Sequence, residues 1–181
     1  MLFRSRETRA QDAPPPDAPP STRFASLRDS GSQSDVRLSF RTFGESHPDM
    51  MALELLGRVL GEGMSSRVQR KLRDELGLAY DCFAGIDPAE DAGALDLGGS
   101  VDHAKVPELV RTLHGLVTDV AASAIPEAEL ARVVSRFVWD LRAMHDDPHG
   151  LATYYCTQTL GGRYDTLDDD RRQALAVTRE D

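Results

Sequence analysis

The histidines are the first residues to examine, because the imidazole nitrogen is a common zinc ligand in proteins. Of the five histidines, only His145 and His149 have the i, i+4 spacing that places two rings on one face of a helix. The run His145-Asp146-Asp147-Pro148-His149 is similar to the inverted zinc signature H-x-x-E-H. Pro148, however, occupies the position of the general-base glutamate, and a proline there breaks the helix that would aim both rings. We therefore interpret this run as a polar helix end and predict no metal site in this chain.

The candidate nucleophiles are better explained by structural roles. Ser65 and Ser66 precede an expected helix, where a hydroxyl caps the N-terminus. Cys82 lies in an apolar strand pattern, and burial raises the pKa of a thiol and makes it unreactive. The spacing Gly61-x-Gly63 is not followed by G-K-[ST] and does not complete G-x-G-x-x-G, so a phosphate-binding loop is not predicted.

Composition and charge limit the class of protein. The chain has 181 residues, of which 40% are apolar and 28% are charged, and these values are typical of a globular domain. It contains no run of about 18 apolar residues, which a membrane-spanning helix needs. The 21 basic and 30 acidic residues give a net charge of −9, so we expect neither nucleic acid nor an anionic membrane surface as a partner. Cys82 and Cys156 lack a C-x-x-C partner and are expected to be buried free thiols. The first residues lack the apolar core of a signal peptide, which leaves the compartment unknown and predicts a cytoplasmic protein if the chain is complete.

The order of the predicted elements indicates the fold class. Residues 1–22 are rich in proline and are predicted to be a disordered tail or linker, so the folded domain is expected to span 23–181. Val36, Leu38 and Phe40 alternate with polar residues, which predicts a half-buried strand. The later patterns predict, in order, a helix that opens at Pro48, a helix over 67–76, a hairpin with strands 78–86 and 94–101, two long helices that include 106–120 and 130–144, and helices over 149–160 and 168–176. Such grouping favours an α+β fold, a mostly antiparallel sheet with helices packed on one face.

The predicted helix over 67–76 has signals at both of its ends. Ser66 and Gln69 form a capping-box pattern at the start, and Gly77 is placed where a left-handed residue ends a helix. Its core face is predicted to consist of Val68, Leu72 and Leu76.

The segment from Leu60 to Tyr80, LGEGMSSRVQRKLRDELGLAY, resembles the pitrilysin/insulinase family of zinc metallopeptidases, whose zinc motif is the inverted H-x-x-E-H. The similarity is to the C-terminal half of the bacterial and mitochondrial-processing-peptidase-like branch, the half that does not bind the metal. That half has a Gly-rich loop, then S-S-R and a hydrophobic residue, a helix, and R-x-x-x-G-L-A-Y leading into a strand. The resemblance extends from Ser34 through Glu127-Ala-Glu-Leu130 to the stretch 160–162.

The resemblance implies a clamshell in which an N-terminal half of similar fold holds zinc and the C-terminal half closes over it to hold a peptide. It implies that Arg73 and Tyr80 reach toward the scissile peptide. Arg73 would grip a substrate carbonyl or carboxylate, and Tyr80 would donate to the oxyanion that forms during hydrolysis. Gly61 and Gly63 align with the substrate-contacting loop, and a simple turn explains them equally well. Without the resemblance, Arg73 would be interpreted as a solvated helix residue and Tyr80 as a half-buried strand residue.

These features predict the substrate-binding, non-zinc half of a zinc metalloendopeptidase, inactive alone because it lacks H-x-x-E-H. Its expected partners are an H-x-x-E-H-bearing N-terminal domain or subunit, which would carry the zinc, and a peptide substrate. The alternative is a non-peptidase structural or assembly subunit of the same fold. Because family members usually continue into a further helix and strand, the domain 23–181 is expected to lack its last helix and strand. An unpaired sheet edge of this kind is expected to promote self-association.

Overall fold

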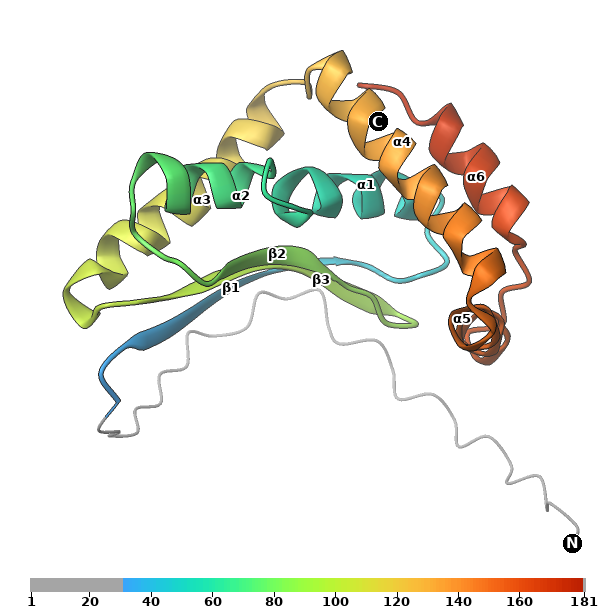
Figure 1. The fold of residues 1–181 in the computed structure, drawn as a ribbon, viewed down its shortest axis with the longest axis horizontal. Coiled ribbons are helices and arrows are strands. Elements are labelled where there is room, and N and C mark those ends of the chain that lie inside the picture. The colour runs from blue at the N-terminus through green and yellow to red at the C-terminus, as the bar shows by residue number, and fades with distance from the viewer. Residues whose placement is uncertain (1–30, 181) are drawn as a thin grey trace, which may run out of the picture. The chain divides into compact units, whose positions relative to one another are not determined.

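Figure 1 shows the computed structural model of the chain, which describes residues 31–180. The predicted tail, residues 1–22, and the predicted start of the domain at residue 23 lie outside the described residues. The strands are β1 (Ser34–Phe43), β2 (Cys82–Asp87) and β3 (Ala92–Val101). The α-helices are α1 (Met50–Gly61), α2 (Arg67–Gln69), α3 (Val106–Ala122), α4 (Glu127–Ala143), α5 (Pro148–Leu160) and α6 (Leu167–Ala176). The shorter helical segments are the π-helix η1 (Arg70–Glu75) and the 3₁₀ helices η2 (His103–Lys105) and η3 (Met144–Asp146).

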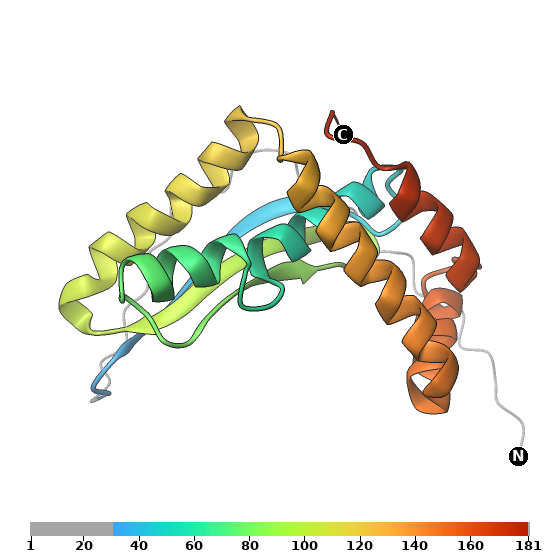
Figure 2. The same ribbon diagram turned by 45° about the horizontal axis from the view of Figure 1, so that its top comes forward.

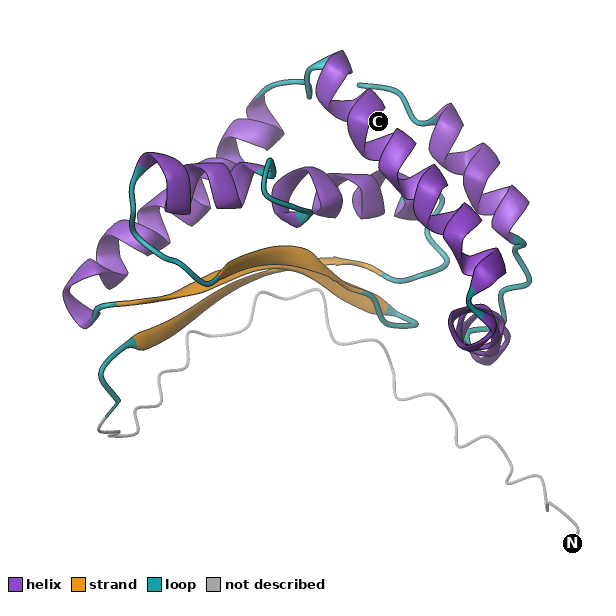
Figure 3. Ribbon diagram, in the orientation of Figure 1, coloured by secondary structure: helices purple, strands orange, loops and turns teal. Residues whose placement is uncertain are grey.

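The three described strands form one antiparallel sheet in the order β1-β3-β2 (Figure 3). β1 pairs with β3 along its whole length, from Ser34 opposite Val101 to Phe43 opposite Ala92. Exposed and half-buried side chains alternate along β1, as the period of two in its sequence predicted. Figures 1 and 2 show α1, α2 and α3 over one face of the sheet, with α4 and α6 side by side next to them. The predicted α+β fold is confirmed.

Two apolar clusters hold the described domain together, and helix α1 belongs to both. Leu60 of α1 packs into the first cluster, whose fully buried members include Leu97 of the central strand and Leu109 of α3. Leu55 and Val59 pack into the second cluster, against α4 and α6. Helix α1 therefore fixes the position of the sheet and α3 relative to the C-terminal helices.

The segment predicted as a helix over 67–76 is helical, but most of it is a π-helix. The Leu76 N–H donates to the carbonyl oxygen of Lys71 at 3.2 Å, which is an i→i+5 hydrogen bond. Val68 and Leu72 are fully buried as predicted, whereas Leu76 is 41% exposed. The prediction for Leu76 was wrong because it assumed 3.6 residues per turn, and the wider π-turn rotates this side chain away from the core.

Two smaller predictions also need correction. The strand expected from residue 78 begins at Cys82, because Leu78 is held in the turn that follows η1. Cys82 is buried, as predicted, but Cys156 is exposed on α5. None of the helices in residues 31–180 combines the length and the apolar character that a membrane crossing requires.

Candidate functional site

Arg73 lies in the π-helix η1, and Tyr80 lies in the bend between η1 and β2. The turn that joins them is built on Leu72, whose carbonyl oxygen accepts a hydrogen bond from the backbone N–H of Leu78 at 2.8 Å. Gly77 reverses the chain with a φ of +56°, in the left-handed region that glycine adopts without a steric penalty. The predicted role of Gly77 at the helix end is confirmed, and the reversal returns the chain to the side of Arg73.

Arg73 and Tyr80 are in contact. The guanidinium carbon of Arg73 lies 4.9 Å from the centroid of the Tyr80 ring, within the range of a cation–π interaction. Tyr80 is 82% exposed, so it is not the half-buried strand residue that its local sequence alone indicates. Within residues 31–180, Arg73 forms no ion pair with a carboxylate, and its Nη1 donates at 3.5 Å to the sulfur of Met64. The structure therefore brings both predicted residues together on the surface.

The loop after α1 contacts Arg73. Gly61 ends α1 against β2, where a Cβ atom would lie 1.9 Å from the carbonyl oxygen of Ala84. Gly63 has a φ of +75° and open space around its Cβ position, so its backbone conformation is what favours glycine. Met64 follows and extends its sulfur to Arg73. Gly61 is thus explained by close packing, whereas Gly63 and Met64 bring the predicted substrate loop to the Arg73 side chain.

The Arg73–Tyr80 pair can supply hydrogen-bond donors but is not arranged as a metal centre. A guanidinium presents N–H groups in a planar fork that matches a carboxylate, and a phenol can donate to an oxyanion. In residues 31–180 no group of three or more His, Cys, Asp or Glu side chains could hold a metal ion. His145 lies in η3 and His149 in the first turn of α5, so the two rings belong to different helical segments.

Ser66 has the capping role that its position predicted, and Cys82 is buried. The Ser66 hydroxyl oxygen accepts a hydrogen bond from the Gln69 N–H at 3.4 Å and caps α2. The Gln69 side chain donates at 2.9 Å to the carbonyl oxygen of Cys82, which ties the helix to β2. Burial raises the pKa of the Cys82 thiol and keeps it in its unreactive neutral form.

A pair that was not predicted from the sequence stabilises the frame around the site. Arg67, in the S-S-R motif, donates to Glu129 of α4 through Nε at 3.1 Å and Nη2 at 2.6 Å. The two side chains are 15% and 13% exposed. Hydrogen bonds from Arg67 lower the pKa of Glu129, against the raising effect of burial. Both residues lie in stretches that carry the family resemblance, and this was the available signal that they are important.

The comparisons with known proteins identify the family of this chain. Residues 3–137 match the family described as "Peptidase M16 inactive domain". An uncharacterized zinc protease of Mycobacterium tuberculosis (strain ATCC 25618 / H37Rv) is 31% identical over 150 residues, which cover 82% of this chain and 34% of that protein. The chain thus spans about a third of the length of the curated relatives that it matches across most of its length.

Solved structures share the fold. A protease from Helicobacter pylori has a TM-score of 0.79 and 22% sequence identity, and the match covers 84% of this chain and 37% of that chain. The inactive peptidase domain of a zinc protease from Bordetella parapertussis has a TM-score of 0.70 and 17% identity, and it covers 86% of this chain and 85% of that chain. The predicted resemblance to the non-metal half of a zinc peptidase is confirmed, and the chain belongs to the family of peptidase M16 inactive domains.

Proposed function

We propose that this chain is the substrate-binding, non-zinc half of a zinc metalloendopeptidase, in which Arg73 and Tyr80 contact the scissile peptide. The observation that carries the proposal is the contact of these two residues at 4.9 Å on the surface. The fold does not bury Tyr80, which is 82% exposed, and the half-buried Arg73 has no carboxylate partner in the described residues. Tyrosine and arginine are also among the residue types that are enriched at the energetic centres of binding surfaces.

The two side chains have different proposed roles. The Arg73 fork binds a carbonyl or carboxylate of the peptide before any bond changes, so it contributes to ground-state binding and positioning. The Tyr80 hydroxyl donates to the oxyanion that develops on the scissile carbonyl, so its contribution is larger in the transition state. Contact with the guanidinium holds the phenol ring in one place on an otherwise open surface.

The zinc belongs, in this proposal, to an N-terminal partner domain or subunit that carries H-x-x-E-H. The described residues of this chain do not fit a metal, because they lack a group of three suitable ligands. The chain alone is therefore expected to cleave no peptide. The motif from Gly61 to Tyr80 supports the finer assignment to the mitochondrial-processing-peptidase-like branch.

The test uses the protein that joins this chain to its H-x-x-E-H partner, with initial rates measured on a fluorogenic peptide. Tyr80→Phe is expected to lower kcat by about 10²–10³ with little change in KM, because it removes one oxyanion donor. Arg73→Ala is expected to raise KM as well as lower kcat, because a positioning contact exists before the transition state.

Matched controls separate these roles from general effects of surface substitution. Tyr164 is 80% exposed, close to the exposure of Tyr80, so Tyr164→Phe is expected to leave the kinetics unchanged. Arg70 lies in the same π-helix and pairs with Glu75 at 3.6 Å, so Arg70→Ala is the control for Arg73. Wild-type kinetics for both site variants, with the fold intact, would contradict the proposal and favour the structural or assembly subunit.

A further inference from the structure

A polar network lies between α5 and α6, away from the elements that carry Arg73 and Tyr80. The Tyr154 hydroxyl donates to Asp170 Oδ2 at 2.7 Å and accepts a hydrogen bond from Gln158 Nε2 at 3.0 Å. In α5, all of whose residues are described, Gln158 is the one buried residue. This helix therefore buries an amide where an amphipathic helix would bury an apolar stripe.

The network leaves two buried acceptors without a donor. Asp170 and Gln158 are 6% and 7% exposed. Asp170 Oδ1 and Gln158 Oε1 have no hydrogen-bond partner among the described residues. Buried polar atoms are nearly always hydrogen-bonded, because an unsatisfied one loses its interaction with water without replacement. Two such atoms in one network are places for a donor that the described residues do not supply.

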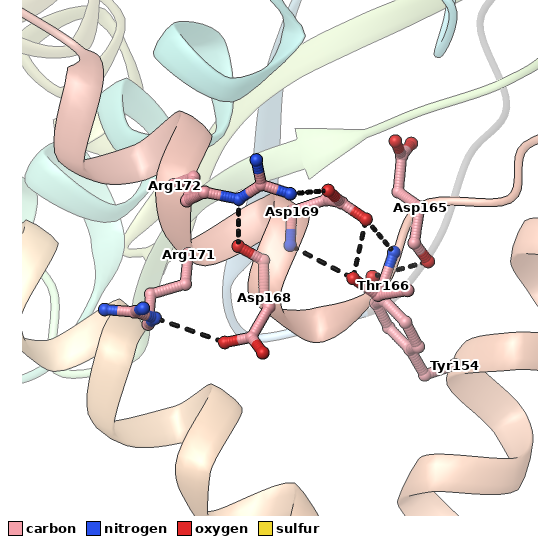
Figure 4. Close-up of polar contacts among 7 residues, drawn as sticks. All are labelled: Tyr154, Asp165, Thr166, Asp168, Asp169, Arg171 and Arg172. Atoms are coloured by element: carbon pink, nitrogen blue, oxygen red, sulfur yellow. Dashed lines mark hydrogen bonds and ion pairs between the residues drawn. The ribbon is translucent and has the colours of Figure 1, made fainter.

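The position of Asp170 is fixed by the cap of its helix. Figure 4 shows Thr166 and Asp169 exchanging hydrogen bonds at the start of α6, with the Asp169 N–H donating to Thr166 Oγ1 at 3.2 Å. The same view shows the Tyr154 hydroxyl directed at the carbonyl oxygen of Asp165. Asp170 follows directly after this cap, and its backbone N–H donates to the Thr166 carbonyl oxygen at 3.0 Å, so the first turn of α6 sets its backbone position.

Asp170, Gln158 and Tyr154 line a cavity of about 970 Å³. This volume lies in the range of small-molecule sites, which is roughly 300–1,000 Å³. The apolar part of the lining includes Met50 and Met51 of α1, Phe137 of α4 and Met144 of η3. The cavity thus has a polar end with acceptors and an apolar body.

The charges of the lining favour a cation. Its charged groups are Glu45, Glu54, Asp165, Asp170 and Arg163, and its histidine rings are those of His47 and His149. Glu54 pairs with Arg58 at 2.9 Å, and Arg163 pairs with Asp165 at 3.4 Å. Glu45 and Asp170 therefore give the cavity its negative excess. Burial raises the pKa of Asp170, so a cation beside it would favour its charged form.

We propose that this cavity is a binding site for an organic cation, whose ammonium or guanidinium group donates to Asp170 Oδ1 and Gln158 Oε1 while its apolar part lies against the methionines and Phe137. A metal ion fits less well, because the described residues offer no group of three suitable ligands. The site does not depend on the proposed peptidase role, since neither Arg73 nor Tyr80 lines the cavity.

The test titrates the 181-residue chain with benzylamine at pH 7, by calorimetry and by NMR of the Gln158 side-chain amide. Benzyl alcohol, which has the same apolar body without the charge, is the matched probe. Saturable binding of benzylamine, with a shift of the Gln158 amide signals and much weaker binding of benzyl alcohol, is the expected result. Nα-acetyl-lysine N-methylamide is titrated in parallel, and its affinity relative to benzylamine distinguishes a peptide side chain from a free amine as the natural source of the cation.

Two variants of α6 make the test specific. Asp170→Asn is expected to weaken benzylamine binding about tenfold or more, because it removes the charged acceptor. Asp168→Asn makes the same change of charge at a side chain that is 83% exposed, and its affinity is expected to equal that of the wild type. Failure of benzylamine to bind the folded wild-type chain, equal binding of benzyl alcohol, or equal binding by Asp170→Asn would overturn the proposal. The wild-type NMR titration decides the question if Asp170→Asn does not fold.

Discussion

The Arg67–Glu129 pair offers a direct test of what the S-S-R motif does for the fold. Two hydrogen bonds, at 3.1 and 2.6 Å, join α2 to the start of α4. With exposures of 15% and 13%, both charges are largely removed from water. Replacing one partner leaves the other charge buried without a counter-ion, and for a fully buried pair this lowers the free energy of unfolding by about 3–5 kcal/mol. Because both side chains keep some exposure to water, the expected loss of stability is smaller here. Arg67→Met and Glu129→Gln are each expected to lower the free energy of unfolding by about 2–3 kcal/mol.

The double variant is the informative measurement. Because it removes both charges, neither is left without a partner, and we expect it to be less destabilised than the sum of the single variants by about 2 kcal/mol. The assay is urea unfolding at pH 7, followed by far-ultraviolet circular dichroism. Trp139 is 63% exposed, so its fluorescence is a poor reporter of burial. In thermal unfolding each single variant should lose roughly 5–10 °C, since 1 kcal/mol corresponds to about 2–4 °C in a domain of this size.

A double-mutant cycle on Lys71 and Glu75 is the control. These two residues of η1 form an ion pair at 2.8 Å, but their side chains are 42% and 46% exposed. We expect no resolvable coupling between them, because water and salt screen an exposed pair. If the coupling energy between Arg67 and Glu129 were as small as that of the control pair, burial would not strengthen the interaction. The structural role assigned to the motif would then be refuted.

Two further predictions concern packing and pH. Gly61→Ala should lower the free energy of unfolding by about 3 kcal/mol or more in the urea assay, since its Cβ would meet the backbone of β2 at 1.9 Å. Gly115→Ala is the control: it lies in open space on α3 and should raise the free energy of unfolding by about 1 kcal/mol. Arg67 lowers the pKa of Glu129, so the stabilisation by Glu129 is present above its unfolded pKa of about 4.3 and is lost as pH falls through the lower folded value. As the pH is lowered, the free energy of unfolding of Glu129→Gln should therefore fall less steeply than that of the wild type. Urea unfolding measured at a series of acidic pH values checks this, and equal slopes for the two proteins would contradict it.

The fold could be predicted where the pattern of apolar residues was regular. The alternation of Val36, Leu38 and Phe40 identified β1, and helical spacing identified α3 and α4, because one face of each element must be buried. The prediction failed at the π-helix, where the sequence has no marker for an extra residue in a turn. Leu76 consequently points to solvent although its spacing from Leu72 matches an α-helix.

The candidate site could be predicted only in part. The proximity of Arg73 and Tyr80 followed from the resemblance and from Gly77 as the turning residue, and the structure brings them to 4.9 Å. The contact of Arg67 with Glu129 could not be derived in this way, because 62 positions separate them and no local pattern relates them. Long-range ion pairs depend on how helices pack, which the period of a single helix does not determine.

The two candidate sites differ in shape, and this difference indicates different classes of ligand. Tyr80 is 82% exposed on an open surface, where a small molecule would bury too little area to bind. A peptide held between two domains can cover such a surface, since the partner supplies the opposite wall. Asp170 and Gln158 instead lie at the polar end of a cavity, which can surround a small cation on several sides. One oxygen of each lacks a donor among residues 31–180, and a ligand that donates to both would remove the cost of leaving them unpaired. The open pair therefore suits a macromolecular substrate, whereas the cavity suits a small organic cation or a single basic side chain.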